Sequence, residues 1–363
     1  MASSTTAAAA AADMDVNPRA HMLPQVTITD EITGATYLRG GLIGRGAFSQ
    51  CYTVADTQKR IYAVKAVART LLQKKKEYER VKREIRIHKG LAHRFVVQCH
   101  ACLQDPNFVY ILLEYCSNRS LMALHLRRRA LTEPEGRYFF AQLVEATRYL
   151  HRCKVIHRDL KLGNLFLSDA MHVKVGDFGL ATKVTYDGER QTERCGTPNY
   201  MAPEMVSMRK GGYSFEVDIW ALGCILYTLL VGTPPFETHS IKTTFSKIRS
   251  NDYCIPASAG LSAEATRMIQ VLLQSDPLQR PSPHAILQHP FLSQCYVPAT
   301  LPPSALHMVP DLTGIPAAAP FFGSPTAQAG MLATAATTSD PVPARSHSVC
   351  HSVRTDAGVS SWV

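Results

Sequence analysis

The feature that most constrains this chain is the run HRDLKLGN, residues 157–164, which an Asp-Phe-Gly tripeptide follows at Asp177. Asp159 supplies a carboxylate that can accept a proton from an attacking hydroxyl. Asn164 and Asp177 offer the hard oxygen ligands that Mg²⁺ takes, and Lys161 places a positive charge where a transferring phosphoryl group needs neutralising. A salt-bridged loop is the ordinary alternative, but it does not explain these offsets. The run predicts phosphoryl transfer. The expected catalytic residues are Asp159, Lys161 and Asn164, and the expected metal ligands are Asn164 and Asp177.

Length and composition permit one large or two medium domains with a sizeable core. The chain has 363 residues, of which 46% are hydrophobic. It carries 39 Lys and Arg against 29 Asp and Glu, a formal charge of +10. This excess suits acidic or phosphate-rich partners, although an unspecialised basic surface explains it equally well. No RNA-recognition or zinc-finger pattern occurs, so we expect no nucleic-acid partner, and nucleic-acid binding is only a third interpretation.

The cysteines and the apolar runs indicate the compartment. Ten cysteines are scattered without a paired framework, and Cys99 with Cys102 forms one isolated CxxC motif. Free thiols in a reducing compartment are favoured over a structural or redox pair. The alanine run Ala7–Ala12 is too short to span a bilayer, and Ile219–Val231 fits a buried helix. We therefore expect an intracellular, soluble protein without a membrane partner.

Both ends of the chain differ in composition from its middle. Residues 1–36 are first rich in Ala, Ser and Thr and then mixed, and we interpret them as a disordered N-terminal arm. From about Pro298 the chain turns to Pro, Ala, Ser and Thr, which cannot bury enough apolar surface to fold alone. We expect one folded domain over residues 37–291, with a linker and a disordered tail over residues 292–363.

Two segments before the catalytic run indicate nucleotide binding. In GRGAFS, Gly44 and Gly46 let the backbone approach phosphates without a Cβ clash, although two glycines fit any tight turn. Lys65 ends the strand-like run YAVK, where a lone lysine is normally a solvated edge charge. Here Glu84 follows on a helical stretch, beside its apolar face. A Lys65–Glu84 ion pair would hold the α and β phosphates of ATP.

Three further patterns place the catalytic run among its neighbours. The β-rich run Phe108–Leu113 leads into residues 114–116, which suits an adenine-binding hinge. Thr132 with Glu135 forms a capping box at a helix start. The run 217–231 is apolar nearly all round, so it indicates a central buried helix.

Contacts around the catalytic run can also be predicted. Asp218 is expected to accept hydrogen bonds from the catalytic-loop backbone, and Arg280 is expected to pair with Glu204. Residues 177–204 resemble the segments that switch between ordered and disordered states through a phosphate–arginine contact. Arg158, next to the predicted base, is the expected receptor of such a phosphate.

Roughly residues 38–310 resemble the polo-like kinases, a branch of the serine/threonine protein kinases. The stretches that carry the resemblance are GRGAFSQCY, RALTEPEGRYFFAQ, VIHRDLKLGNLFL, VGDFGLATKV, CGTPNYMAPE, YSFEVDIWALGCILYTLLVGTPPFET and DPLQRPS. The resemblance implies an α+β, bilobal protein kinase fold, with a small β-rich N-lobe over about 37–113, the hinge, and a larger helical C-lobe over 117–291. It also implies transfer of the γ-phosphate of ATP to Ser or Thr of proteins, with Mg²⁺. The hinge sequence ILLEYC favours the second, third or fifth members of the family.

The resemblance assigns the site residues motif by motif. It implies that Cys51, Ala63 and Phe166 sandwich the adenine. The full set of implied ATP-binding residues is Leu42, Ile43, Gly44, Arg45, Gly46, Ala47, Phe48, Ser49, Gln50, Cys51, Ala63, Lys65, Glu84, Leu113, Glu114, Cys116 and Phe166. The regulatory positions are Thr192, Glu193 and Arg158.

The chain departs from the family pattern in two places. The activating threonine of the family lies two residues before the cysteine of CGTPNY, where this chain has Glu193, with Thr192 one residue earlier. A carboxylate carries about −1 against roughly −1.5 to −2 for phosphothreonine, so we hypothesise that Glu193 partly mimics the phosphate. The two phosphopeptide-binding polo boxes of the family would follow the kinase domain. The chain ends too soon to hold them, so we expect a short family member or a fragment.

The main alternative is a catalytically weak or silent pseudokinase that acts as an interaction scaffold. Such proteins usually lose an ion-handling residue. In this chain all five are present, namely Lys65, Glu84, Asp159, Asn164 and Asp177. The resemblance further implies protein substrates with acidic residues before the target Ser or Thr. It also implies a monomer found in the nucleus and cytoplasm and at the centrosome.

Overall fold

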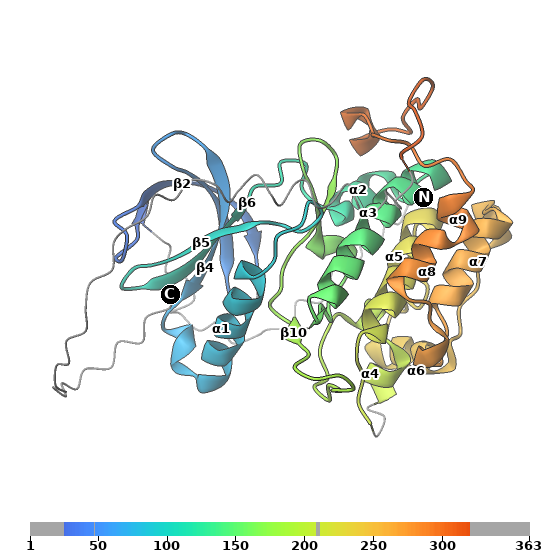
Figure 1. Cartoon of the computed structure of the whole chain (residues 1–363), viewed down its shortest axis with the longest axis horizontal. Coiled ribbons are helices and arrows are strands. Elements are labelled where there is room, and N and C mark those ends of the chain that lie inside the picture. Colours follow the sequence, from blue (N-terminus) through green and yellow to red (C-terminus); the bar gives the residue numbers. More distant parts are fainter. Residues whose placement is uncertain (1–24, 47, 208–210, 320–363) are drawn as a thin grey trace, which may run out of the picture. The chain divides into compact units, whose positions relative to one another are not determined.

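The computed structural model describes residues 25–46, 48–207 and 211–319 (Figure 1). The predicted ATP-binding residue Ala47 lies outside these ranges, as do residues 1–24 of the predicted arm and 320–363 of the predicted tail. The chain separates into two compact units. The first unit comprises the described residues up to Val81 together with Cys99–Tyr115, and the second comprises Lys82–Gln98 and the described residues from Cys116 onward.

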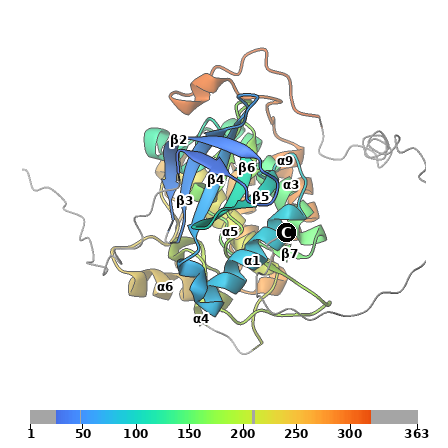
Figure 2. The same cartoon turned by 90° about the vertical axis from the view of Figure 1, so that its left-hand side faces the viewer.

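The first unit is an antiparallel sheet whose described strands follow the order β1-β2-β3-β4-β6-β5 (Figure 2). Its core lies on one face, because alternate residues of neighbouring strands point the same way. Tyr52, Val54, Val64 and Ala66 are buried there. The strands are β1 (Thr27–Thr29), β2 (Thr36–Arg45), β3 (Gln50–Ala55), β4 (Ile61–Ala68), β5 (Cys99–Gln104) and β6 (Phe108–Glu114). The helix α1 (Lys75–Lys89) is divided between the two units after Val81.

The second unit is mainly helical, with short strands around its catalytic loop. Its α-helices are α2 (Leu121–Arg128), α3 (Glu133–Arg152), α4 (Pro203–Ser207), α5 (Glu216–Val231), α6 (Ile241–Ser250), α7 (Ala263–Leu272), α8 (Pro283–Gln288) and α9 (Pro290–Ser293). Its strands are β7 (Val155–Ile156), β8 (Leu165–Leu167), β9 (Val173–Val175) and β10 (Thr182–Lys183). Its 3₁₀ turns include η3 (Leu162–Asn164), η4 (Pro198–Tyr200), η6 (Pro277–Gln279) and η7 (Pro303–Leu306).

The helix α5 lies at the centre of this unit, as its apolar sequence predicts. Every residue from Val217 to Leu230 is buried. Glycines let its neighbours approach closely: a Cβ on Gly136 of α3 would lie 2.6 Å from Leu230 Cδ2. A Cβ on Gly223 of α5 would lie 2.7 Å from a methyl group of the residue after α7, Leu273. The helix α3 begins with the predicted capping box.

The start of the folded part differs from the prediction. Residues 27–29 of the predicted arm form β1, which pairs with β2. Asp30 is buried and accepts a hydrogen bond from the backbone N–H of Gln104 at 3.0 Å. The sequence gives little sign of this strand, because its three residues gain their stability from the sheet and not from a local pattern.

The end of the folded part differs in the same way. Residues 293–319, here called the C-terminal strap, belong to the predicted linker and tail but pack against the helices. Leu301 and Leu306 are buried, and Arg128 donates a hydrogen bond to the Ala305 carbonyl at 2.7 Å. A strap of this kind has no periodic apolar pattern, since each anchoring side chain reaches the core separately.

Candidate active site

The catalytic loop follows β7 and is anchored to the first turn of α5. The backbone N–H groups of His157 and Arg158 donate to the two carboxylate oxygens of Asp218, each at 3.0 Å. His151 Nε2 lies 2.9 Å from the same carboxylate. Burial raises the pKa of Asp218, but these hydrogen bonds and the nearby histidines lower it by more, so the carboxylate stays ionised. The predicted contact between Asp218 and the loop backbone is confirmed.

Three side chains hold the carboxylate of Asp159. Thr197 Oγ1 donates to Oδ1 at 2.7 Å, and Asn164 Nδ2 donates to Oδ2 at 3.1 Å. Lys161 Nζ lies 2.8 Å from Oδ2 and also donates to Thr197 Oγ1 at 2.8 Å. A carboxylate held in this way keeps one orientation, and a lysine stands beside the position where negative charge would develop. The structure therefore brings together Asp159, Lys161 and Asn164.

The Asp-Phe-Gly tripeptide follows β9 and adjoins the catalytic loop. Gly176 N–H donates to the Asn164 carbonyl at 3.0 Å. Asp177 is exposed and adopts a left-handed backbone conformation, φ 57°. Phe178 is fully buried, with its ring 4.6 Å from that of His88 and 5.2 Å from that of His157. The buried phenylalanine fixes the turn, so that the aspartate side chain remains accessible beside the loop.

The buried guanidinium of Arg158 faces the segment that carries Glu193. Arg158 NH1 lies 3.4 Å from Glu193 Oε2; the arginine side chain is 1% exposed and the glutamate side chain 52% exposed. Burial lowers the pKa of Arg158, but Cys195, Tyr213 and Glu193 raise it by more. Thr192 is exposed. Of the two candidate regulatory positions, Glu193 is therefore the one that pairs with the predicted receptor.

In the first unit, several predicted nucleotide-binding residues share one face of the sheet. Cys51 lies opposite Lys65, and Ala63 lies opposite Leu113. Directly opposed residues share a face, and Ala63 and Lys65 are two apart on β4, so all four point the same way. This face is the one opposite the core of Tyr52 and Val64.

The glycine-rich stretch forms the turn between β2 and β3. Arg45 pairs with Gln50, Gly44 pairs with Cys51, and Gly46 N–H donates to the Ser49 carbonyl at 2.8 Å. The side chains at its edges are exposed, namely those of Leu42, Ile43 and Phe48. Glu114 pairs with Tyr62 at the end of β6. The other predicted ATP-binding residues belong to the second unit: Glu84 is buried, and Cys116 and Phe166 are half-buried.

Comparison with known proteins decides the family. Residues 37–292 match the protein kinase domain. This chain belongs to the protein kinase family. Serine/threonine-protein kinase PLK1 of Xenopus laevis is 48% identical over 295 residues, which are 81% of this chain and 48% of the relative. The kinase plk-2 of Caenorhabditis elegans is 50% identical over 277 residues, 76% of this chain and 43% of the relative. The kinase polo of Drosophila melanogaster is 47% identical over 278 residues, which are 76% of this chain and 48% of the relative.

This chain thus spans about half the length of the curated relatives that it matches. The predicted resemblance to polo-like kinases and the predicted bilobal kinase fold are confirmed. The predicted ion pair between Glu204 and Arg280 is also present in this kinase, at 2.7 and 2.8 Å. None of the helices in the described ranges is long and apolar enough to cross a membrane.

The predicted Mg²⁺ ligands fit a protein kinase. Asn164 uses Nδ2 for both of its contacts to Asp159, which turns the amide oxygen away from that carboxylate. The exposed carboxylate of Asp177 adds a second hard donor. No cluster of three or more His, Cys, Asp or Glu side chains suited to a metal occurs in the part of the chain that the structure describes. Mg²⁺ commonly takes one or two protein ligands and completes its shell with substrate phosphates, so two such donors are compatible with a Mg²⁺ site.

The sequence reasoning missed Thr197 as a site residue. It had entered only as one letter of the stretch CGTPNY. Its hydroxyl bridges Lys161 and Asp159, although it lies 38 positions after the aspartate in the sequence. The only available signal was its place in a segment already expected to return to the catalytic loop.

Proposed function

We propose that this chain transfers the γ-phosphate of ATP to Ser and Thr hydroxyls of proteins, as a polo-like kinase. The observation that carries the proposal is the carboxylate of Asp159, held by Thr197, Lys161 and Asn164 within 3.1 Å. A carboxylate fixed in this way can take the proton of an attacking hydroxyl as the phosphoryl group arrives. Lys161 then neutralises charge that develops on the transferred group.

The remaining residues are assigned to nucleotide and metal. Asn164 and Asp177 would hold Mg²⁺, which neutralises the phosphate oxygens when it is bound. The glycine-rich turn and Lys65 would contact the phosphates, with Glu84 positioning Lys65. The shared sheet face of Cys51, Ala63 and Leu113 supports their role against the adenine, and Phe166 is assigned to the adenine in the same proposal.

The scaffold alternative lacks support. A silent kinase fold usually loses a catalytic or metal-binding group, whereas Asp159 has three partners here. The relatives that the chain resembles are named kinases. Protein substrates with acidic residues before the acceptor, a monomeric state, and a place in the nucleus, the cytoplasm and at the centrosome belong to the same proposal. The high positive charge of the chain, +10, agrees with acidic substrates.

A phosphotransfer assay tests the proposal. The chain should label casein from radioactive ATP in the presence of Mg²⁺. Asp159→Asn should lower the rate by about 10²–10⁴-fold, because it removes the proton acceptor. Asp187→Asn is the matched control, since Asp187 is a 96% exposed aspartate of the same unit that pairs with exposed Lys154. Equal rates for wild type and Asp159→Asn would refute the assignment.

A further inference from the structure

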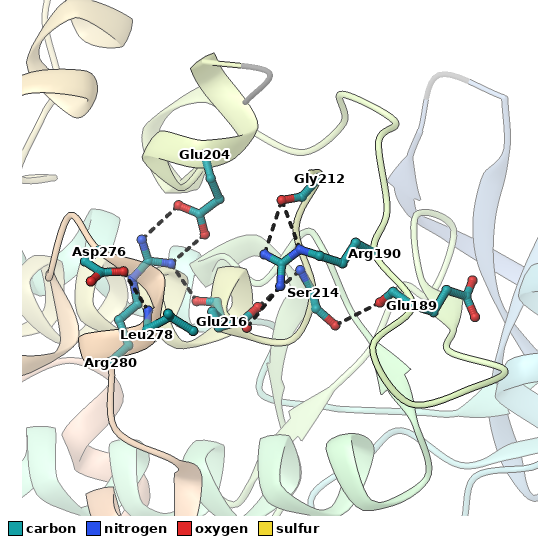
Figure 3. A network of polar contacts seen from close by, with 9 residues as sticks. All are labelled: Glu189, Arg190, Glu204, Gly212, Ser214, Glu216, Asp276, Leu278 and Arg280. Atoms are coloured by element: carbon teal, nitrogen blue, oxygen red, sulfur yellow. Dashed lines mark hydrogen bonds and ion pairs between the residues drawn. The ribbon is translucent and has the colours of Figure 1, made fainter. Parts of the chain in front are cut away.

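Residues 189–193 of the segment between Asp177 and Glu204 lie antiparallel to residues 212–216, just before α5. Gln191 N–H donates to the Tyr213 carbonyl at 2.7 Å, and Tyr213 N–H donates back to the Gln191 carbonyl at 2.9 Å. The Ser214 hydroxyl also donates to the Glu189 carbonyl at 3.5 Å (Figure 3). We call these two stretches the clasp. They join a long connecting segment to the start of the most buried helix of the unit.

Side-chain charge reinforces the clasp. Arg190 donates to the Gly212 carbonyl through Nε at 3.3 Å and through NH2 at 3.2 Å. Its third nitrogen, NH1, lies 3.7 Å from Glu216 Oε1, and the other oxygen of Glu216 accepts from Ser214 N–H at 3.2 Å. Figure 3 shows Arg190 pointing toward Gly212 and Glu216 across the clasp. Hydrogen bonds from a charged group are stronger than those between neutral groups, so one arginine secures several residues.

The clasp depends on a glycine. Gly212 has φ +68°, and a Cβ there would lie 2.5 Å from the Gln191 carbonyl oxygen. Its neighbour Gly211 also has a positive φ, +108°, but a Cβ there would meet nothing within 4 Å. An alanine at either position would therefore have a strained backbone, but only Gly212→Ala would push the two stretches apart.

The clasp is itself tied to the catalytic loop through Tyr213 and Glu193. Tyr213 OH donates to the Glu193 carbonyl at 2.6 Å and accepts from Arg158 NH1 at 3.2 Å. The carboxylate of Glu193 reaches the same guanidinium at 3.4 Å. Four residues later Thr197 contacts Asp159. The order of the segment and the orientation of the base are therefore linked through one short run of chain.

Segments of this kind are usually ordered by a phosphate that pairs with an arginine. Here a carboxylate of the chain already pairs with that arginine, and the clasp fixes the stretch that carries this carboxylate. We propose that the clasp and the Arg158–Glu193 pair hold the segment in its catalytic arrangement without phosphorylation. This inference rests on the proposed function and deepens it, because it concerns the regulation of the same site.

The order of the segment is tested without reference to activity. The full chain is treated with phosphatase, and the absence of phosphate is verified by intact mass. The backbone N–H groups of Gln191 and Tyr213 should then exchange slowly with deuterium, because each donates within the clasp. Gly212→Ala should make their exchange about tenfold faster or more, since it forces the stretches apart. Gly211→Ala is the control and should leave their exchange within about threefold of wild type.

The dependence of activity on phosphate is tested with the same dephosphorylated chain. Its rate on casein should stay within about twofold of the untreated chain, and Thr192→Val should do the same. Glu193→Gln keeps the size of the side chain but removes its charge, and it should lower kcat about two- to fivefold, as expected for a half-exposed ion pair. The KM for ATP should not change, because Glu193 is placed on the connecting segment and not on the nucleotide site.

The outcomes separate the two proposals. Rapid exchange of Gln191 and Tyr213 in the dephosphorylated wild type would overturn the inference. Loss of activity on phosphatase treatment or on Thr192→Val, with Glu193→Gln neutral, would overturn it too and leave the kinase function standing. If the two amides are protected but no form of the chain transfers phosphate, the proposed function is overturned, while the conclusion that the segment is ordered stands.

Discussion

Removal of the Arg280 guanidinium should destabilise the helical unit strongly. Arg280 lies after η6 and donates to both oxygens of Glu204 in α4, at 2.7 and 2.8 Å. It also donates to the carbonyls of Gln274 and Glu216, each at 2.9 Å, and lies over the ring of Trp220. The two charged side chains are 0% and 3% exposed, so water cannot replace a lost partner.

The expected magnitude follows from that burial. Arg280→Leu leaves the Glu204 carboxylate buried without its counter-charge, which typically costs about 3–5 kcal/mol. In a unit of this size each kcal/mol lowers Tm by about 2–4 °C, so we expect a decrease of roughly 6–20 °C. The double variant Glu204→Leu/Arg280→Leu removes both charges. It should be more stable than Arg280→Leu by about 1–3 kcal/mol, although it still loses the two carbonyl contacts.

Chemical and thermal unfolding of the wild type, both single variants and the double variant would measure these values. The control is Arg267→Leu, since Arg267 forms a pair with Glu264 in which its side chain is 55% exposed. That change should cost at most about 1 kcal/mol. A cost below about 1 kcal/mol for Arg280→Leu, or simple additivity of the two single changes, would refute the argument from burial.

Three further predictions follow from local geometry. Thr197→Val should lower kcat about tenfold or more in the casein assay, because it frees the carboxylate of Asp159. Thr197→Ser keeps the hydroxyl and should retain most of the rate, so equal losses for both variants would contradict the hydroxyl's role. Gly223→Ala should lower the free energy of unfolding in urea by about 1–3 kcal/mol, because the added Cβ would meet Leu273. An unchanged urea midpoint would show that the helices can separate without cost. Burial and nearby positive charges lower the pKa of His93 from 6.5 to about 4. The unfolded chain therefore binds this proton more readily, and Tm should fall as the pH drops from 6.5 toward 4. His93→Asn should flatten that part of the profile, and an identical profile for the variant would rule His93 out as the cause.

The sequence predicted those parts of the molecule whose structure is decided by residues close together in the chain. The capping box of Thr132 and Glu135 is set within four residues, and the all-round apolar run of α5 can only be buried. The catalytic run was recognisable because its acid, lysine and amide lie within one short loop. The contacts predicted for Asp218 and Arg280 are also both present.

Tertiary contacts decided what the sequence left open. The strand β1 exists because β2 offers it an edge, and one of the hydrogen bonds to the buried Asp30 comes from Gln104, 74 residues later. The C-terminal strap is held by single anchors such as Leu301 and Leu306, which a Pro- and Ala-rich composition conceals. Thr197 escaped notice for the same reason, since a Thr-Pro pair says nothing locally about a carboxylate far earlier in the chain.

The carboxylate that faces Arg158 also bears on how such a protein could be controlled in a cell. Glu193 is part of the polypeptide, so it arrives with translation and leaves only when the chain is destroyed. If this pair replaces the phosphate, as proposed above, a kinase of this design cannot be switched off by a phosphatase acting at this position. Its output would then follow the number of molecules present, and control would pass to the rates of synthesis and degradation.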